Sequence, residues 1–313
     1  MSVDSSELYN VKRQFFLGSF KSLIDMPLPD PSSADYIPTL VYKARAQIAT
    51  DPAEVASLIP ADSENVALKA AAALGRYVST SEDAEQEAAL EELRDLAVEI
   101  EGEDVEGSQR DKNSVLVLAG TAFARAGDVE EALETLLVET EDLEAVAVIV
   151  QIYLSINRVD RARKEFERAK QWAEDDLLLQ LIESSIGLVA TRDGYSNSNS
   201  FYTEQLGNPS LSSPHILTAR GVTRILRNEV PEAKSDLEES LEQQKGDAET
   251  LAASVVAAGI DSKNKDEAEQ LWTRLTTEHP LHPLVVDVAQ KGDLFDEFCA
   301  KFTVPPLAVP AAA

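Results

Sequence analysis

The chain contains 313 residues, 44% of them hydrophobic, and carries a formal net charge of −28 at pH 7. This acidity argues against binding to the phosphates of nucleic acids and against direct docking on anionic lipid. The acidic N-terminus lacks the basic and apolar pattern of a signal peptide, and no apolar run approaches the ~18 residues of a membrane span. We therefore expect a cytoplasmic protein without direct membrane insertion.

The first hundred residues predict helix pairs. Residues 7–16 carry an apolar face at helical spacing, Gly18 ends this helix, and Phe20 begins the next. A strongly acidic helix with an apolar stripe follows between residues 82 and 100. Residues 101–108 are expected to form an exposed loop and not a calcium site, because they lack alternating oxygen ligands around a turn glycine.

Two junctions further along the chain share one pattern. They span residues 119–132 and 150–162. In each, an aromatic residue of a first helix (Phe123 or Tyr153) precedes a tight break by four residues, and an alanine follows the break by five. This arrangement is typical of the tetratricopeptide repeat (TPR), whose period is about 34 residues.

Alanines at this position recur, and each is followed four residues later by a large apolar residue. The pairs are Ala132 with Leu136, Ala162 with Phe166, Ala233 with Leu237, and Ala268 with Trp272. Successive alanines are 30, 71 and 35 residues apart, and Gly120 and Gly221 precede their alanines by twelve residues. Small residues are needed where two helices cross closely, and a large residue one turn later fills the groove.

The repeats are clearest over residues 112–175 and 214–280. Between them, residues 180–207 predict a degenerate repeat, with an apolar first helix and a long polar turn over residues 193–200. Strand patterns are nearly absent. We therefore predict an all-α fold: a single TPR-like helical-hairpin solenoid over residues 1–303, curved or ring-like, followed by a disordered tail over residues 304–313. A generic helical bundle with chance alanines is the alternative.

The sequence contains no convincing catalytic, cofactor or metal site. His215, His279 and His282 are the histidines, and the last two are three residues apart without a third ligand. No phosphate-binding loop, nucleophile elbow or His-Glu-x-x-His motif is present. The lone Cys299 lies between two phenylalanines and is expected to be a packed residue. We predict no enzymatic activity, no cofactor and no small-molecule substrate.

Several stretches resemble one known family. They are residues 7–24, 148–154, 158–165, 279–280 and 291–298, and together they extend over nearly the whole chain. Their order and spacing are similar to those of the epsilon subunits of coatomer, the COPI vesicle coat. The resemblance implies a non-enzymatic coat subunit in Golgi-to-endoplasmic-reticulum and intra-Golgi transport, peripheral on Golgi and COPI vesicle membranes. It also implies a partner, the C-terminal domain of the alpha coatomer subunit, whose protruding β-hairpin the curved repeats enclose.

The inner face of the repeats is the expected partner surface. In a repeat of this type the first helix of each pair lines the inner surface, and its side chains directed away from the second helix contact the partner. Helical spacing nominates Gln151, Tyr153, Arg224, Asn228 and Phe123 as contacts. For Tyr153 and Phe123, packing against the second helix is the alternative.

Two other classes of function stay open. A TPR adaptor or co-chaperone that clamps a peptide needs lysines, arginines and asparagines on successive first helices, whereas these helices are mostly apolar and acidic. An enzyme embedded in the solenoid has no supporting constellation of residues.

Overall fold

The computed structural model describes residues 4–60, 63–102, 108–190, 192–208, 213–260 and 265–303. All regular elements in these ranges are helices, as predicted, and no strand occurs among them. In chain order they are α1 (Ser6–Phe16), α2 (Phe20–Asp25), α3 (Tyr36–Thr50), the short helix η1 (Pro52–Glu54), α4 (Val55–Leu58), α5 (Val66–Ser79), α6 (Asp83–Glu99), α7 (Gln109–Ala126), α8 (Val129–Thr135), α9 (Leu143–Ser155), α10 (Val159–Ala169), α11 (Leu177–Ala190), α12 (Arg192–Leu206), α13 (Pro214–Leu226), α14 (Val230–Gln243), α15 (Ala248–Ile260), α16 (Lys265–Glu278) and α17 (Pro283–Lys301). The expected tail over residues 304–313, and residues 103–107 of the expected acidic loop, lie outside the described residues.

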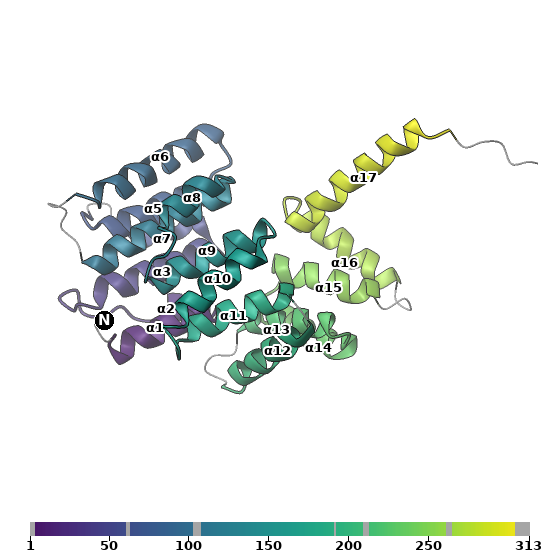
Figure 1. Ribbon diagram of the computed structural model, residues 1–313, viewed down its shortest axis with the longest axis horizontal. Helices are drawn as coiled ribbons and strands as arrows, with labels where there is room; N and C mark the ends of the chain where they lie inside the picture. Colours follow the sequence, from purple (N-terminus) through teal and green to yellow (C-terminus); the bar gives the residue numbers. More distant parts are fainter. Residues whose placement is uncertain are drawn as a thin grey trace, which may run out of the picture.

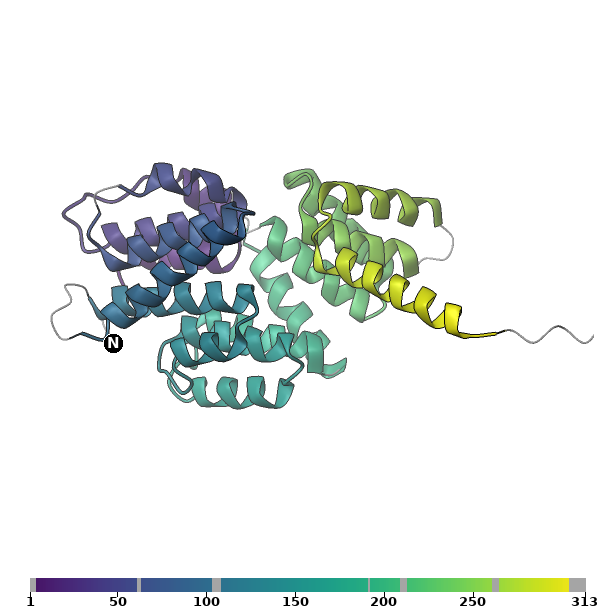
Figure 2. The same ribbon diagram turned by 90° about the horizontal axis from the view of Figure 1, so that it is seen from above.

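From α5 onward, consecutive helices pack in pairs: α5 with α6, α7 with α8, α9 with α10, α11 with α12, α13 with α14, and α15 with α16. The first helices α5, α7, α9 and α11 also pack in succession. At the next junction α13 packs mainly against α12, and α15 then packs against α13. The pairs form a curved array (Figure 1), and Figure 2 shows its two halves from above. The predicted curved, all-α helical-hairpin solenoid is thereby confirmed.

In three pairs, the turn after the first helix contains a residue with a left-handed backbone. Gly127, Asn157 and Asn228 have φ angles of 92°, 59° and 64°, and each precedes its repeat alanine by five residues. In each turn the next backbone N–H donates to a carbonyl of the preceding helix: Asp128 to Phe123 (3.0 Å), Arg158 to Tyr153 (2.7 Å) and Glu229 to Arg224 (2.8 Å). Glycine and asparagine adopt this conformation most readily, which explains the break residues of the sequence pattern.

The residues of the alanine pattern lie inside the helix pairs. The buried ones are Ala132, Leu136, Ala162, Phe166, Ala233 and Leu237. Ala268 and Trp272, in the last pair of the array, are half-buried.

Gly120 and Gly221 allow close approach of the two helices in a pair. A Cβ atom on Gly120 would lie 2.5 Å from Cγ of Leu136, and one on Gly221 would lie 2.9 Å from Cγ of Leu237. These distances are shorter than van der Waals contact, so any side chain would displace the leucine or separate the helices.

A truncated second helix explains the short interval between Ala132 and Ala162. Helix α8 has 7 residues, whereas α10, α14 and α16 have 11, 14 and 14. One α-helical turn contains about 3.6 residues. The loss of one turn therefore accounts for an interval of 30 residues, compared with the usual period of about 34.

The predicted polar turn over residues 193–200 is wrong, because these residues belong to α12. Ser198 occupies the missing alanine position, 36 and 35 residues from the neighbouring repeat alanines, and is 1% exposed. Tyr202, four residues later, takes the place of the large residue and is buried. Helices α11 and α12 thus form a pair of the same type as the other repeats.

Small polar residues pack here because their polar groups are satisfied. The Ser198 hydroxyl lies 3.1 Å from the carbonyl oxygen of Ser184 and 3.0 Å from that of Gly194. A Cβ atom on Gly194 would lie 2.6 Å from the carbonyl oxygen of Gly187, so the backbones of α11 and α12 are in direct contact. Composition alone favours a turn in such a segment, whereas a buried, hydrogen-bonded serine can replace alanine.

Candidate partner-binding surfaces

The nominated residues of α7 and α9 differ in accessibility. Gln151 is exposed on α9. Tyr153 is half-buried and packs against the core on both sides of α9. Phe123 is 1% exposed, and the guanidinium carbon of Arg94 lies 5.4 Å from its ring centroid. Phe123 is therefore packed in the core, which corrects its nomination as an inner-face contact.

Of the nominated residues near the end of α13, Arg224 is engaged in an ion pair and Asn228 lies in a turn. Arg224 Nη1 lies 2.7 Å from the carboxylate of Asp236 and 3.2 Å from the carbonyl oxygen of Glu232. Arg220 makes two further bonds to the same buried carboxylate, at 2.9 and 2.7 Å. Arg224 therefore helps to neutralise a buried charge. Asn228 is exposed, but it lies two residues beyond the end of α13, in the left-handed turn and not on a helix face.

Exposed apolar side chains mark the C-terminal ends of four successive first helices. They are Ile156 directly after α9, Val189 in α11, Leu226 in α13 and Ile260 in α15, and each is 42–50% exposed. They recur at intervals of 33, 37 and 34 residues. We call these four residues the apolar edge. Sequence reasoning missed them because apolar residues at helical spacing are normally assigned to the core; their recurrence near the repeat period was the available signal.

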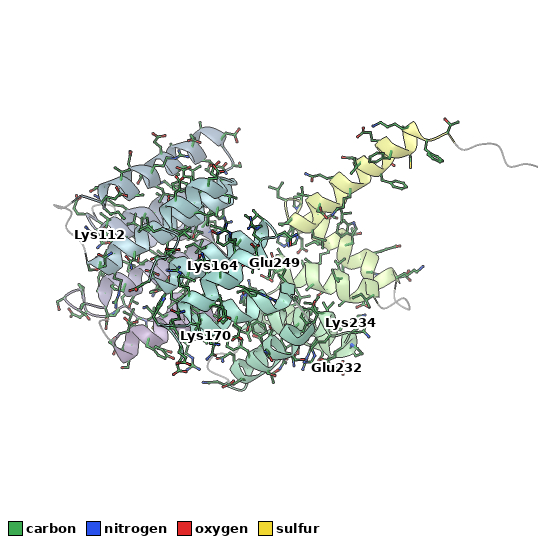
Figure 3. The ribbon with its side chains drawn as sticks, viewed as in Figure 1. Lys112, Lys164, Lys170, Glu232, Lys234 and Glu249 are labelled. Atoms are coloured by element: carbon green, nitrogen blue, oxygen red, sulfur yellow. The ribbon has the colours of Figure 1, made fainter. Side chains whose placement is uncertain are left out.

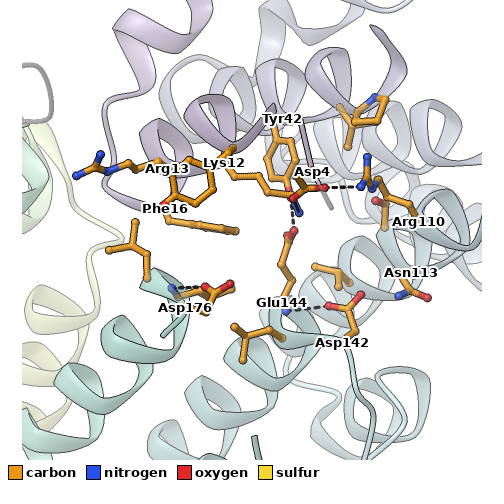
Figure 4. A pocket seen from close by; sticks show the side chains of 18 of the residues that line it. Asp4, Lys12, Arg13, Phe16, Tyr42, Arg110, Asn113, Asp142, Glu144 and Asp176 are labelled. Atoms are coloured by element: carbon orange, nitrogen blue, oxygen red, sulfur yellow. Dashed lines mark hydrogen bonds and ion pairs between the residues drawn. The ribbon is translucent and has the colours of Figure 1, made fainter. Parts of the chain in front are cut away.

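The N-terminal segment, residues 4–25, lies against the side of the array; we call it the N-terminal clasp. Asp4 pairs with Lys12 of α1 at 2.7 Å and also with Arg110 of α7. Between α1, α3, α7 and the starts of α9 and α11 is a cavity of about 500 Å³, and Figure 4 shows the Asp4 and Glu144 side chains extending into this region from different elements. The carboxylate of Asp4, near the N-terminus, and the guanidinium of Arg110, at the start of α7, thus meet beside this cavity.

A carboxylate of α9 connects this region to α3. Glu144 accepts hydrogen bonds from the Tyr42 hydroxyl and from Arg45, the latter at 2.6 Å. Burial by itself raises the pKa of Glu144, but the charge of Arg45 and the bond from Tyr42 outweigh it, so the pKa is lowered. Burial, followed by the charge of Glu144, raises the pKa of Tyr42 well above its usual value. The Glu144 carboxylate is therefore engaged in holding α3 against α9.

The other end of the clasp reaches the second half of the array. The hydroxyl of Ser213 donates to the carbonyl oxygen of Leu17 at 2.5 Å, across 196 residues of sequence. The Leu17 side chain is fully buried with Tyr202 of α12 and Ile216 of α13. It fills the junction where α13 packs mainly against α12.

His279, His282 and Cys299 are placed by local structure. His279 Nε2 lies 2.7 Å from the carbonyl oxygen of Gly246, and His282 Nδ1 accepts the N–H of Leu284 (3.2 Å) at the start of α17. Cys299 is exposed on α17, which corrects the expectation of a packed thiol. Within the described ranges, no group of three or more His, Cys, Asp and Glu could hold a metal ion. None of the helices described here is both long and apolar enough to cross a membrane.

Comparison with known proteins identifies the chain's family. Residues 4–303 match the coatomer epsilon subunit family. The chain belongs to this family. The resemblance carried by residues 7–24 and 291–298, among other stretches, is thereby confirmed.

Two relatives in the coatomer epsilon family are similar to this chain over nearly their whole length. The coatomer subunit epsilon of Caenorhabditis elegans is 28% identical over 296 residues, which cover 93% of this chain and 97% of the relative. The probable coatomer subunit epsilon of Schizosaccharomyces pombe is 25% identical over 305 residues, which cover 95% and 96%. A solved tetratricopeptide repeat protein from Parabacteroides merdae has a TM-score of 0.55 and 14% identity, over 87% of this chain and 98% of that one. This likeness confirms the TPR-like fold.

The basic groups of a peptide clamp are sparse on the first helices of this epsilon-family chain. Helices α9, α11 and α15 contain no Lys or Arg, and the two arginines of α13 are paired with Asp236. Of the lysines labelled in Figure 3, Lys164 and Lys170 lie on or directly after α10, a second helix, and Lys112 lies near the start of α7. The basic residues of the described first helices α5 and α7 are Lys69, Arg76, Arg110, Lys112 and Arg125. From α9 to α15, by contrast, the described first helices offer no succession of unpaired basic residues of the kind that the adaptor hypothesis requires.

Proposed function

We propose that the chain is a non-enzymatic structural subunit of the COPI coatomer that binds the C-terminal domain of the alpha subunit. In this role it supports coat assembly for Golgi-to-endoplasmic-reticulum and intra-Golgi transport. It is cytoplasmic and reaches Golgi and vesicle membranes through the complex, not by inserting itself. The observation that carries the proposal is the match of residues 4–303 to the coatomer epsilon subunit family.

The array supports binding of a protein partner. Exposed apolar groups that recur along a solenoid can form a binding surface, and the apolar edge supplies one such group in, or directly after, each of four first helices. Gln151 is exposed and Tyr153 is half-buried on α9, within one to two turns of Ile156. A net charge of −28 favours a partner surface with basic groups. We propose the apolar edge, with Gln151 and Tyr153, as the contact of the array with the alpha subunit.

Binding to the purified C-terminal domain of the alpha subunit tests the proposed function. Mixed at micromolar concentration, the two proteins should co-elute from a size-exclusion column, and calorimetry should give one binding event. Separate elution of two folded proteins would overturn the proposal.

Substitution of the apolar edge tests the proposed contact. The double variant Ile156→Asp/Leu226→Asp should weaken binding by about thirtyfold, since it places charge at the centre of an apolar contact. Val98→Asp is the control, because Val98 is 71% exposed on the second helix α6; its affinity should stay within about twofold. Equal affinities of the two folded variants would exclude the apolar edge while leaving the proposed function intact.

A further inference from the structure

Helix α17 extends away from the array (Figure 1). Only its first turn is packed: Leu284 and Val285 contact the apolar cluster that includes Trp272 and Leu275. From Asp287 to Thr303 every residue is exposed. A helix of 19 residues is thus anchored at one end and otherwise has no neighbour among the described residues.

The exposed part of α17 is amphipathic. Val288, Phe295, Phe298 and Phe302 follow at intervals of 7, 3 and 4 residues and are 45, 67, 61 and 72% exposed. These intervals place Val288, Phe295 and Phe298 on one helical face, and Phe302 follows directly after the last helical residue. Gln290 and other polar residues occupy the opposite face. Two large aromatic rings on one face, with a third directly after the helix, form a larger apolar surface than single exposed residues do, and such a surface marks an interaction site.

The helix is formed before any partner arrives. His282 caps its N-terminus and Pro283 occupies its first position, both of which favour helix initiation. Ion pairs four residues apart, Lys291 with Asp287 and Lys301 with Glu297, support its exposed length. Because the backbone is already ordered, docking requires little further loss of chain entropy.

The charges on α17 favour some binding partners over others. Its two lysines are paired within the helix. Asp293 and Asp296 form no ion pair with the described residues, and helical spacing places them outside the aromatic stripe, about 160° and 100° around the helix from Phe295. A second copy of a chain with net charge −28 would be repelled, as would anionic lipid. An apolar groove on a basic surface of another protein would complement both the aromatic face and the acidity of the chain.

We propose that α17 docks as a helix, through Phe295 and Phe298 and with Phe302 directly after its end, into an apolar groove on a basic surface of the alpha-coatomer C-terminal domain. The inference rests on the proposed function for the identity of the partner. It defines a contact separate from the apolar edge, because α17 lies beyond the last pair of the array.

The test compares two double variants of the full-length chain that add equal charge to opposite faces of α17. Phe295→Asp/Phe298→Asp should weaken binding to the alpha C-terminal domain by about thirtyfold. Gln290→Asp/Ala300→Asp should bind within about twofold of the original chain. Both should unfold at the original temperature, since these side chains are exposed and bury nothing in the free chain.

The outcomes are distinguishable. If the original chain does not bind the alpha domain at all, the proposed function fails. If it binds and the phenylalanine variant binds equally well, the function stands and the inference about α17 is overturned. The inference is equally overturned if the phenylalanine variant abolishes self-association in sedimentation, or flotation on phosphatidylserine vesicles, while binding to the alpha domain is unchanged.

Discussion

At the residue scale, small side chains control how closely the helices of a pair approach. Gly120 and Gly221 leave space that Leu136 and Leu237 fill, and buried alanines line the same crossings. Ser198 has this role in the repeat between them, with its hydroxyl bonded to backbone carbonyl oxygens. A polar residue can therefore serve a packing role when the surrounding backbone satisfies it.

Gly120→Ala should destabilise the chain by about 1–3 kcal/mol, because the new Cβ atom would lie 2.5 Å from Cγ of Leu136. Urea unfolding followed by circular dichroism measures the change. Gly259→Ala is the matched control, since nothing lies within 4 Å of its added Cβ atom, and it should be neutral or slightly stabilising. Equal losses in the two variants would contradict the role of close packing.

Asp236→Ala should cost about 3 kcal/mol, because it leaves the partly buried Arg220 and Arg224 without their shared carboxylate. Arg224→Ala should cost less, since Arg220 still neutralises the carboxylate. Thermal unfolding of both single variants and of the double variant gives the coupling between the two residues. The control is Glu239→Ala, an exposed change on the same helix, which should change stability by at most about 0.5 kcal/mol. If it costs as much as Asp236→Ala, the loss reflects any change in α14 and not the missing carboxylate.

At the element scale, the N-terminal clasp adds contacts that a regular repeat array lacks. Its α1 helix packs on α3, Asp4 reaches α7, and Leu17 reaches α12 and α13. Glu144 joins α3 to α9 in the same region. These contacts connect elements that are distant in sequence, and they use buried charge as well as apolar surface.

Stability should depend on pH through Glu144. Its pKa in the folded chain is lowered, so it stabilises the fold at pH values above the unfolded pKa of about 4.3, and this contribution is lost as pH falls through the folded pKa. The original chain should be more stable than Glu144→Gln by about 1–3 kcal/mol at pH 7, and the difference should shrink below about pH 4.3. Urea unfolding of both proteins at several pH values measures this. A difference that stays constant from neutral to acidic pH would refute the assignment.

At the scale of the whole molecule, the clasp makes the two halves of the curved array depend on each other. The α1–α2 connection bonds to Ser213 and places Leu17 beside Ile216. A simple solenoid transmits stability only between neighbouring repeats. Here a contact across 196 residues joins the first helices to the fifth pair of the array, α13 and α14.

Leu17→Ala should therefore increase hydrogen exchange in α12 and α13 as well as near the N-terminus. Removal of a fully buried leucine costs about 2–5 kcal/mol, and at this position part of the loss falls on the distant helices. Hydrogen exchange read by mass spectrometry locates it. Leu23→Ala is the control, because Leu23 is equally buried but packs among residues of α1–α3. If both variants affect the same segments, the clasp does not couple the halves.

The sequence predicted the fold more completely than it predicted the partner-binding surface. The alanine interval, the break residues and the glycines indicated the helix pairs correctly, because each pair repeats the same local packing. Three of the residues nominated as partner contacts have other roles: Phe123 is buried, Arg224 is paired with Asp236, and Asn228 lies in a turn. Helical spacing shows which residues share a face, but not which neighbour covers that face.

By itself, the sequence determined the all-α repeat architecture and the family, since both depend on residue types at regular intervals along the chain. The polar segment over 193–200 was the exception, because buried hydrogen bonds override local composition. The clasp, the apolar edge and the free face of α17 were decided only by the tertiary structure. Contacts such as that of Leu17 with Ile216 join distant positions once and leave no periodic trace. Whether Phe295 packs or stays exposed depends on where α17 leaves the array, and that direction is set by how the preceding pairs stack.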